Sequence, residues 1–305
     1  MPELPEVETI VRTLAPGILG KRIAAWETPQ PGVPEAGAEL LPLLRNMRIT
    51  RVFRRAKLLL ISVSADDARS GAGAPVPETE GRLMPMSANG AQRGAGDLIL
   101  VFHFKMTGRF FIHPEGTAPL KHTRLILDLD DSRRLFFDDA RKFGYCRVMR
   151  PGDLQNWPFF ASLGPEPLEL SAEELARHFA ARFAKRGVSV KAALLDQTIV
   201  AGIGNIYADE SLFGSGLDPR RPAGSVSGEK LLVLASVLQE ILLRSIRECG
   251  SSIRDYRDAL GNAGAFQNSF QVYGRKGERC PVCKRPLHAA RIAGRGTVYC
   301  PRCQK

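Results

Sequence analysis

The sequence has no long run of apolar residues. None of its apolar stretches approaches the ~20 residues that a transmembrane helix requires. The first ten residues, MPELPEVETI, carry three acids and no basic side chain, whereas a secretory signal peptide starts with a basic region. We therefore expect no membrane-spanning segment and a cytoplasmic location.

Acidic residues are scarce at the C-terminal end. Residues 271–305 contain one acid, Glu278, against nine lysines and arginines, a net charge of +8 in a chain whose formal charge is +11. This excess suits a polyanionic partner, with nucleic acid the first choice and an anionic membrane surface the second. The alternative is a solvated basic tail.

Cysteine is also sparse, and its placement is uneven. Cys146 and Cys249 are isolated, and we expect both to be ordinary buried thiols. The other four form the pairs CPVC and CPRC, separated by 16 residues, which is the spacing of a four-cysteine zinc site rather than of two disulfides. Four thiolates leave no position for water, so one structural Zn²⁺ is expected. Its ligands are Cys280, Cys283, Cys300 and Cys303.

The chain divides into regions of different periodicity. With 305 residues, 44% of them hydrophobic, it is long enough for two or more domains. Eight short β-rich runs predict a sandwich or a barrel. They cover residues 22–28, 48–53, 57–63, 97–104, 109–113, 123–129, 134–139 and 145–149. Residues 65–96 separate two of these runs, and 18 of the 32 are Gly, Ala, Pro or Ser, which predicts a mobile surface insertion.

From about residue 153 the pattern becomes helical. Residues 171–186 begin with a capping box of Ser171 and Glu174, and residues 227–250 predict a long amphipathic helix. Between them, residues 190–213 predict two helices joined by the turn GIGN. This turn allows two interpretations. Its backbone N–H groups and Asn205 contact a phosphate, or it is simply a tight turn between helices in which Asn205 caps the second helix.

The start of the chain also allows two interpretations. Removal of Met1 would leave Pro2 as a free secondary amine, a nucleophile whose pKa lies closer to neutrality than that of a lysine, with Glu3 beside it as a proton donor or acceptor. Alternatively, Pro5 merely occupies the first turn of an amphipathic helix. The apolar face of that helix comprises Leu4, Val7, Val11 and Leu14.

Seven motifs occur together in one order. They are PELPEVET at the start, RRAK at 54–57, HFKMTG at 103–108, DDARKFG at 138–144, LGPEPL, GIGNIYADE, and the terminal QVYGRKGERC…GTVYCPRCQK. Together they resemble bacterial formamidopyrimidine-DNA glycosylase, an 8-oxoguanine DNA glycosylase and AP lyase, over nearly the whole chain except residues 65–96. The resemblance implies a bacterial, nucleoid-associated enzyme, a monomer, whose partner is damaged double-stranded DNA.

The resemblance also implies an α+β fold in three parts. Residues 1–152 would form an N-terminal catalytic helix and an antiparallel β-sandwich. Residues 153–270 would form a helical domain with a helix-two-turn-helix, and residues 271–305 a zinc β-hairpin. DNA would be held between the domains.

The same resemblance implies a reaction and its residues. The Pro2 nitrogen would attack C1′ of the damaged nucleotide, displace the oxidised purine and form an iminium, after which elimination cuts the strand on both sides of the sugar. Glu3 would protonate the ring oxygen, and Lys57 would assist proton transfer and hold phosphate. Arg295 would serve the later elimination step. Taken alone, Lys57 and Arg295 are equally typical of solvated basic residues.

DNA contacts are implied at further positions. A flipped base leaves a gap in the duplex, which an apolar wedge and a planar donor can fill. Periodicity alone would make Met106 and Phe143 core residues, and the resemblance reverses that interpretation. The implied DNA-binding residues are His103, Met106, His122, Arg141, Phe143, Arg186, Lys191 and Asn205.

Some features depart from the family pattern. Phe104 and Lys105 stand where the family often has Leu and Gly, and residues 259–270 match the family's lesion-covering loop too poorly to assign contacts. Two alternatives remain: an endonuclease VIII-like glycosylase that prefers oxidised pyrimidines, and a non-catalytic zinc-hairpin protein that binds DNA. The second would predict loss of Pro2, Glu3 or Lys57, and all three are present.

Overall fold

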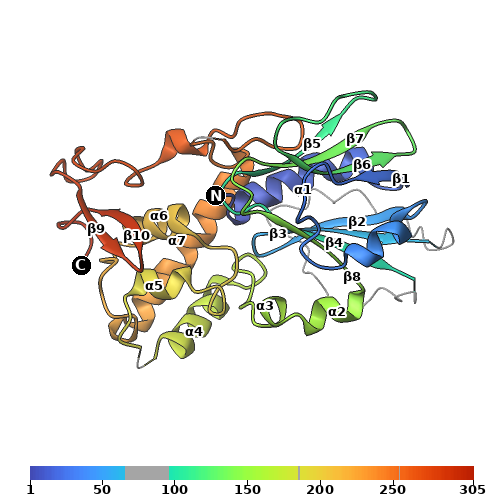
Figure 1. The fold of residues 1–305 in the computed structure, drawn as a ribbon. Coiled ribbons are helices and arrows are strands. Elements are labelled where there is room, and N and C mark those ends of the chain that lie inside the picture. Colours follow the sequence, from blue (N-terminus) through green and yellow to red (C-terminus); the bar gives the residue numbers. More distant parts are fainter. Residues whose placement is uncertain (66–95, 185, 254) are drawn as a thin grey trace. The chain divides into compact units, whose positions relative to one another are not determined.

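The computed structural model describes residues 1–65, 96–184, 186–253 and 255–305 (Figure 1). The chain forms two compact units, and each is described here by itself. The first unit contains residues 1–65, 96–161 and 249–264, and the second contains residues 162–248 and 265–305. Nearly all of the insertion predicted at residues 65–96 lies outside the described residues. No helix of the described ranges is long and apolar enough to cross a bilayer.

The first unit consists of helix α1 (Leu4–Ile18) and two four-stranded antiparallel sheets, seen as two layers in Figure 1. One sheet has the order β1-β6-β7-β5, and the other has the order β2-β3-β4-β8. All eight predicted strands are present, which confirms the sandwich. Their bounds are β1 Ile23–Glu27, β2 Arg48–Arg55, β3 Leu58–Ser64, β4 Leu98–His103, β5 Gly108–His113, β6 Thr123–Leu129, β7 Arg134–Asp139 and β8 Tyr145–Met149. A 3-10 helix, η1 (Ala38–Leu44), and short helices α2 (Pro151–Asn156) and α3 (Pro158–Ala161) complete the unit.

The core of the first unit lies between the sheets and includes one face of α1. Phe102 of β4 meets Phe110 and Phe137 of the other sheet edge-on, with ring centroids 4.9 and 5.4 Å apart. Val7 and Leu14 of α1 are fully buried in the same cluster, as the apolar periodicity predicts. Burial of each such side chain stabilises the unit by about 1.5–3 kcal/mol. The helix start is therefore fixed on the sandwich.

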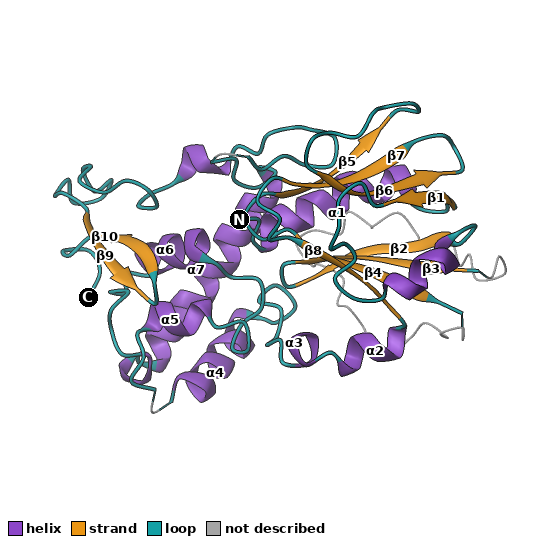
Figure 2. Ribbon diagram, in the orientation of Figure 1, coloured by secondary structure: helices purple, strands orange, loops and turns teal. Residues whose placement is uncertain are grey.

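The second unit is mainly helical (Figure 2). Its helices are α4 Ala172–Phe183, α5 Val190–Leu195, α6 Asn205–Gly214, α7 Gly228–Arg247 and the 3-10 helices η3 Ala223–Ser225 and η4 Phe266–Ser269. The capping box at the start of α4 is confirmed, since Glu174 N–H donates to Ser171 Oγ at 3.2 Å and Ser171 N–H donates to Glu174 Oε2 at 2.7 Å. The strands β9 (His288–Ile292) and β10 (Arg295–Tyr299) form an antiparallel hairpin.

The turn between α5 and α6 lacks the Asn205 cap that one of its two interpretations predicts. Gly204, not Asn205, is the N-cap of α6, and Asn205 is the first helical residue. Gly202 has a φ of 84°, a left-handed conformation that glycine adopts without steric cost. The prediction of an Asn205 cap is therefore wrong.

The unit boundaries also differ from the sequence-based division. Residues 249–264 belong to the first unit because α1 binds them: Ser251 N–H donates to Glu6 Oε1 at 2.8 Å, and Ala259 N–H donates to Thr13 Oγ1 at 3.2 Å. Cys249 begins this segment in a left-handed conformation (φ 59°) and is exposed, so the prediction that it is buried is wrong. Cys146 is buried, as predicted.

Candidate functional site

The start of α1 holds the proposed nucleophile and its acid. Pro2 and Glu3 are both buried, and Glu3 is the N-cap residue of α1. The backbone N–H of Glu3 donates to Glu6 Oε2 at 2.9 Å, which fixes the first turn. In the full chain the Pro2 nitrogen is an amide nitrogen bonded to Met1, so it becomes a nucleophile only after Met1 is removed.

Lys57 lies in the tight turn between β2 and β3, directly after Ala56, whose φ is 53°. Arg54 ties this turn to α1: its Nε donates to Glu8 Oε2 at 3.2 Å, and its Nη1 donates to the Ala56 carbonyl at 2.9 Å. The Lys57 residue is only 8% exposed. Glu3 and Lys57 therefore stand on two elements that one buried arginine links.

His103 ends β4 opposite Leu58, the residue after Lys57. Its ring is buried, and Nδ1 accepts the backbone N–H of Lys105 at 3.0 Å. Burial, and then the positive charges of Lys105 and Lys57, lower the pKa of His103 to about 3. The imidazole is neutral at pH 7, so any contact with DNA would be a hydrogen bond rather than an ion pair.

The three predicted wedge residues lie on two neighbouring turns of the first unit. Met106, between β4 and β5, is 42% exposed, and Phe143, between β7 and β8, is 57% exposed. The Arg141 guanidinium carbon stands 4.8 Å from the centroid of the Phe143 ring, a stacked arrangement. Neither apolar side chain is in the core, so the interpretation drawn from the resemblance fits, and the one drawn from periodicity does not.

A buried carboxylate holds these two turns together. Asp139 Oδ1 accepts the Thr107 hydroxyl at 2.5 Å and the Arg141 N–H at 3.3 Å, and Oδ2 accepts the Gly144 N–H at 2.5 Å. Asp139 is 0% exposed. The half-buried His122 precedes β6, the strand beside β7, and its carbonyl accepts the Asp139 N–H at 3.0 Å. Asp139 thus fixes the positions from which the wedge residues project.

In the second unit, Arg295 and Asn205 are near neighbours. Arg295 opens β10 and is exposed, directly after the turn formed by Ala293 and Gly294. Asn205 Nδ2 donates to the carbonyl of Gly296 at 2.9 Å, which places the start of α6 against the hairpin. Arg186 is partly exposed and stands 3.7 Å from a carboxylate oxygen of Asp196.

Lys191 is not at the surface. Its side chain is 0% exposed, and Nζ lies 2.5 Å from Asp209 Oδ1, 2.7 Å from Thr297 Oγ1 and 3.3 Å from the Gly296 carbonyl. The ammonium is enclosed by protein groups, which disfavours the predicted direct contact with a phosphate. The sequence carried no signal for this enclosure, since its partners lie 18 and 106 residues away.

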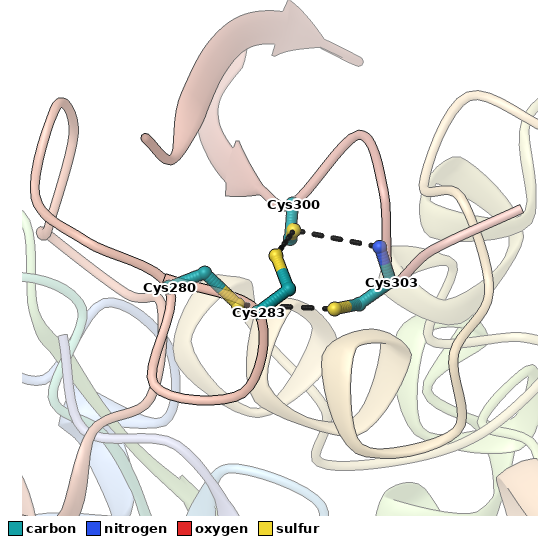
Figure 3. Close-up of side chains that lie close together, drawn as sticks. All are labelled: Cys280, Cys283, Cys300 and Cys303. Atoms are coloured by element: carbon teal, nitrogen blue, oxygen red, sulfur yellow. Dashed lines mark hydrogen bonds between the residues drawn. The ribbon is translucent and has the colours of Figure 1, made fainter. Parts of the chain in front are cut away.

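The four clustered cysteines are brought together by the hairpin region (Figure 3). Their sulfur atoms all lie within 4.8 Å of one another, with Cys280 and Cys303 sulfurs 3.9 Å apart and Cys283 and Cys300 sulfurs 3.4 Å apart. A tetrahedral zinc ion with Zn–S bonds near 2.3 Å separates its sulfur ligands by about 3.8 Å. The donor set therefore fits one zinc ion. A backbone N–H of Arg285 lowers the pKa of Cys283 to about 7, whereas burial raises the pKa of Cys300 and of Cys303, so zinc binding itself must displace their protons.

Sequence reasoning missed several positioning residues. Asp139 was part of a recognised motif but received no role, and neither Arg54 nor Asp209 was singled out. Three non-glycine residues with left-handed backbone stand in the turns of the first-unit site, and no sequence pattern marked them. They are Ala56, Lys105 and Lys142.

Comparison with known proteins extends over the whole chain. The profile for the formamidopyrimidine-DNA glycosylase N-terminal domain matches residues 1–146, and the profile for the formamidopyrimidine-DNA glycosylase H2TH domain matches residues 163–257. The profile for the zinc finger found in FPG and IleRS matches residues 277–305. The four cysteines therefore form the zinc site of this finger.

Individual relatives match at full length. The chain is 44% identical to the formamidopyrimidine-DNA glycosylase of Nitratidesulfovibrio vulgaris, with all of both chains covered. It resembles a crystallised Lactococcus lactis FPG mutant bound to a Fapy-dG containing DNA, with a TM-score of 0.82, 31% identity and full coverage of both chains. It also resembles the wild-type L. lactis FPG bound to an oxidized pyrimidine containing DNA, with a TM-score of 0.81, 30% identity and full coverage of both chains. The chain belongs to the formamidopyrimidine-DNA glycosylase family.

Proposed function

We propose that the protein removes oxidised purines, 8-oxoguanine and formamidopyrimidines, from double-stranded DNA and then cleaves the strand at the abasic site by β,δ-elimination. It would act in base excision repair, as a monomer, in the bacterial cytoplasm at the nucleoid. Beyond family membership, one observation of this structure carries the proposal. Two apolar side chains and an arginine project from neighbouring turns that the buried Asp139 locks together.

The wedge supports an enzyme that extrudes its target nucleotide. A base inside duplex DNA is out of reach of any nucleophile, so the enzyme flips it out and fills the gap. Met106 and Phe143 supply apolar surface for insertion between bases, and Arg141 supplies a planar fork of donors for the orphaned cytosine. The stacking of Arg141 on Phe143 limits the orientations that the guanidinium adopts.

The chemistry is proposed to start at Pro2. With Met1 removed, the secondary amine attacks C1′, the bond to the oxidised base breaks, and the attached nitrogen loses its proton. Glu3 then protonates the sugar ring oxygen, the bond between C1′ and that oxygen breaks, and the open-chain iminium forms. Lys57, in the turn that Arg54 ties to α1, would assist proton transfer and neutralise a phosphate. Because Nδ1 accepts the Lys105 N–H, the neutral ring of His103 carries its proton on Nε2, which can donate a hydrogen bond.

The second unit is proposed to hold the DNA backbone. Arg295 would contact phosphate and promote the later elimination, while Asn205 and Arg186 would contact other phosphates, and His122 of the first unit would do the same. Residues 271–305 add a net charge of +8, which strengthens binding without reading sequence. The zinc ion organises this surface and takes no part in the bond-breaking steps.

Oxidised pyrimidines are a second candidate lesion class. The observation that favours them is the L. lactis relative whose structure contains an oxidized pyrimidine containing DNA. The two candidates share the nucleophile and differ only in the pocket that receives the base. We propose purines as the main substrate, because PELPEVET and DDARKFG match the purine-directed branch.

Excision from three duplexes tests the proposal. Two duplexes carry 8-oxoguanine or formamidopyrimidine opposite cytosine, and the third carries thymine glycol opposite adenine. Both base release and strand cleavage are measured. We expect faster release of the two purine lesions and strand cleavage at both sides of the sugar. Glu3→Gln should bind these duplexes and release base slowly, with Glu39→Gln, an exposed acid elsewhere in the first unit, as control. Preference for thymine glycol, or no base release, would contradict the proposal.

A further inference from the structure

The buried Lys191 uses all of its donors inside the second unit. An ammonium has three N–H donors. Its Nζ donates to three oxygen atoms, Asp209 Oδ1 at 2.5 Å, Thr297 Oγ1 at 2.7 Å and the Gly296 carbonyl at 3.3 Å. They come from α6 and from β10, whereas Lys191 itself belongs to α5. One side chain therefore joins three elements of the unit.

Asp209 binds the same strand, β10, one residue further along. Its Oδ2 accepts the backbone N–H of Val298 at 3.2 Å, while Oδ1 faces Lys191. Burial raises the pKa of Asp209 to about 6, and the charge of Lys191 opposes this rise, so the side chain is a carboxylate at neutral pH. The pair thus presents a fixed acceptor and a fixed donor to consecutive residues of β10.

These contacts lead directly to Arg295. The hydroxyl of Thr297 accepts from Lys191 and donates to the Arg295 carbonyl at 3.4 Å. The Gly296 carbonyl accepts from both Lys191 and Asn205. A two-stranded hairpin is at best marginally stable on its own. The backbone that carries Arg295 is therefore held by side chains of α5 and α6 as well as by its partner strand.

We propose that Lys191, Asp209 and Thr297 are positioning residues that fix Arg295 for its step on the DNA, and that Lys191 does not bind a phosphate itself. This inference rests on the role proposed for Arg295. A buried ion pair is weak evidence of stability, since apolar residues of similar volume often replace one without loss. Its directional contacts to residues 296–298 give it a geometric role instead.

The first test uses the conservative pair Thr297→Val and Thr297→Ser. The valine keeps the volume and removes the hydroxyl that joins Lys191 to Arg295, whereas the serine keeps the hydroxyl. Loss of one hydrogen bond to a charged group should slow the second elimination about tenfold in Thr297→Val. Thr297→Ser should stay within about twofold of wild type. Zinc content and the rate of borohydride trapping at the amine should stay unchanged in both.

A double-mutant cycle shows whether Thr297 acts through Arg295. If it does, Thr297→Val combined with Arg295→Gln is no slower in the second elimination than Arg295→Gln alone. Losses that multiply would overturn the positioning role. The same would follow if Thr297→Val and Thr297→Ser behaved alike.

The second test separates positioning from direct phosphate binding by Lys191. In the Arg295→Gln background, Lys191→Met should leave the salt dependence of DNA binding unchanged. A phosphate ligand would instead reduce the slope by about 0.9. The double variant Lys191→Met with Asp209→Leu avoids an unpaired buried carboxylate, so it answers the question even if Lys191→Met does not fold.

The salt-dependence test of the Lys191 variants requires only that the protein binds DNA. A wild-type protein that binds but never forms an adduct would refute the proposed function, while the salt slopes would still show whether Lys191 binds a phosphate. A further fall in slope in either Lys191 variant would overturn it.

Discussion

The two units of this protein place their charged side chains differently. In the first unit an apolar sandwich forms the interior, and the proposed DNA-contacting side chains Met106, Arg141 and Phe143 project from turns at its end. In the second unit buried ionic groups, Lys191 with Asp209, attach the hairpin to α5 and α6, and a cluster of thiols joins the segments before and after it. In the first unit the side chains proposed to contact DNA are exposed. In the second unit a lysine that the sequence suggests as a DNA contact, Lys191, is buried.

A further buried acid strengthens this contrast. Glu210 of α6 accepts the backbone N–H groups of Gln271, Val272 and Tyr273 at 2.9, 3.0 and 2.7 Å. Asp209, the residue before it, binds β10. Consecutive acids of one helix thus hold the entry to the zinc region and its second strand. In this unit, the buried acids thus fix the position of the zinc region, which carries the exposed basic side chains.

The largest effect is expected from breaking the thiol cluster. Cys283→Ser should release zinc and unfold residues 277–305, because binding of a structural zinc ion supplies about 10–16 kcal/mol in isolated fingers. DNA binding should fall to the background of nonspecific association. Zinc content and lesion binding are the measurements, with Cys249→Ser, an exposed thiol outside the cluster, as the matched control. Full lesion binding by the zinc-free variant would show that the hairpin is dispensable.

The next effect concerns a buried carboxylate of the first unit, that of Asp139. Asp139→Asn replaces an acceptor of three hydrogen bonds by a group that is half donor, and a hydrogen bond to a charged group contributes about 1.5–3 kcal/mol. We expect the free energy of unfolding to fall by about 3 kcal/mol. Both tryptophans lie in this unit, so their fluorescence in urea reports it. Asp130→Asn, an exposed acid, serves as control. Equal stability of the two variants would show that the Asp139 carboxylate does not hold the two turns together.

A smaller effect is expected at the exposed arginine of the wedge. Arg141→Ala should reduce discrimination for cytosine opposite the lesion by about 1–3 kcal/mol, the contribution of one bidentate contact to a base. Excision from duplexes with each of the four opposite bases measures it. Arg45→Ala removes an exposed arginine elsewhere in the unit and should change nothing. An unaltered order and size of preference in Arg141→Ala would show that another group reads the opposite base.

The smallest effect is expected at Arg186. Its partial exposure and the distance of 3.7 Å to Asp196 leave its guanidinium only loosely paired. Arg186→Ala should weaken binding equally for all DNA sequences and reduce the salt slope by about 0.9. Arg177→Ala, on the exposed face of α4, is the control. Equal slopes in the two variants would assign Arg186 to the solvated surface.

The comparison also explains how far the sequence could be interpreted. Local patterns predicted what local physics decides: the eight strands, the apolar face of α1, the Ser171 capping box and the cysteine spacing. They did not predict which lysine is enclosed, because the enclosure of Lys191 depends on Asp209 and Thr297, which are distant in the sequence. Exposure of Met106 and Phe143 likewise follows from turns fixed by Asp139, and periodicity carries no information about it.

Left-handed residues mark a second limit. Ala56, Lys105 and Lys142 adopt positive φ, which is uncommon for residues other than glycine, and none of the three was recognised from the sequence as a turn residue of this kind. Each precedes a proposed functional residue: Lys57, Met106 and Phe143. Backbone strain of this kind collects at functional sites and is maintained by the surrounding structure.

The central claim is that the nitrogen of Pro2 is the nucleophile. Protein lacking Met1 is incubated with a duplex carrying 8-oxoguanine, the intermediate is reduced with borohydride, and the peptide attached to DNA is identified by mass spectrometry. We predict attachment at Pro2 and no adduct when Met1 is retained or the terminus is acylated, while lesion binding persists. Attachment at Lys57 instead would contradict the account, even if the protein released the base.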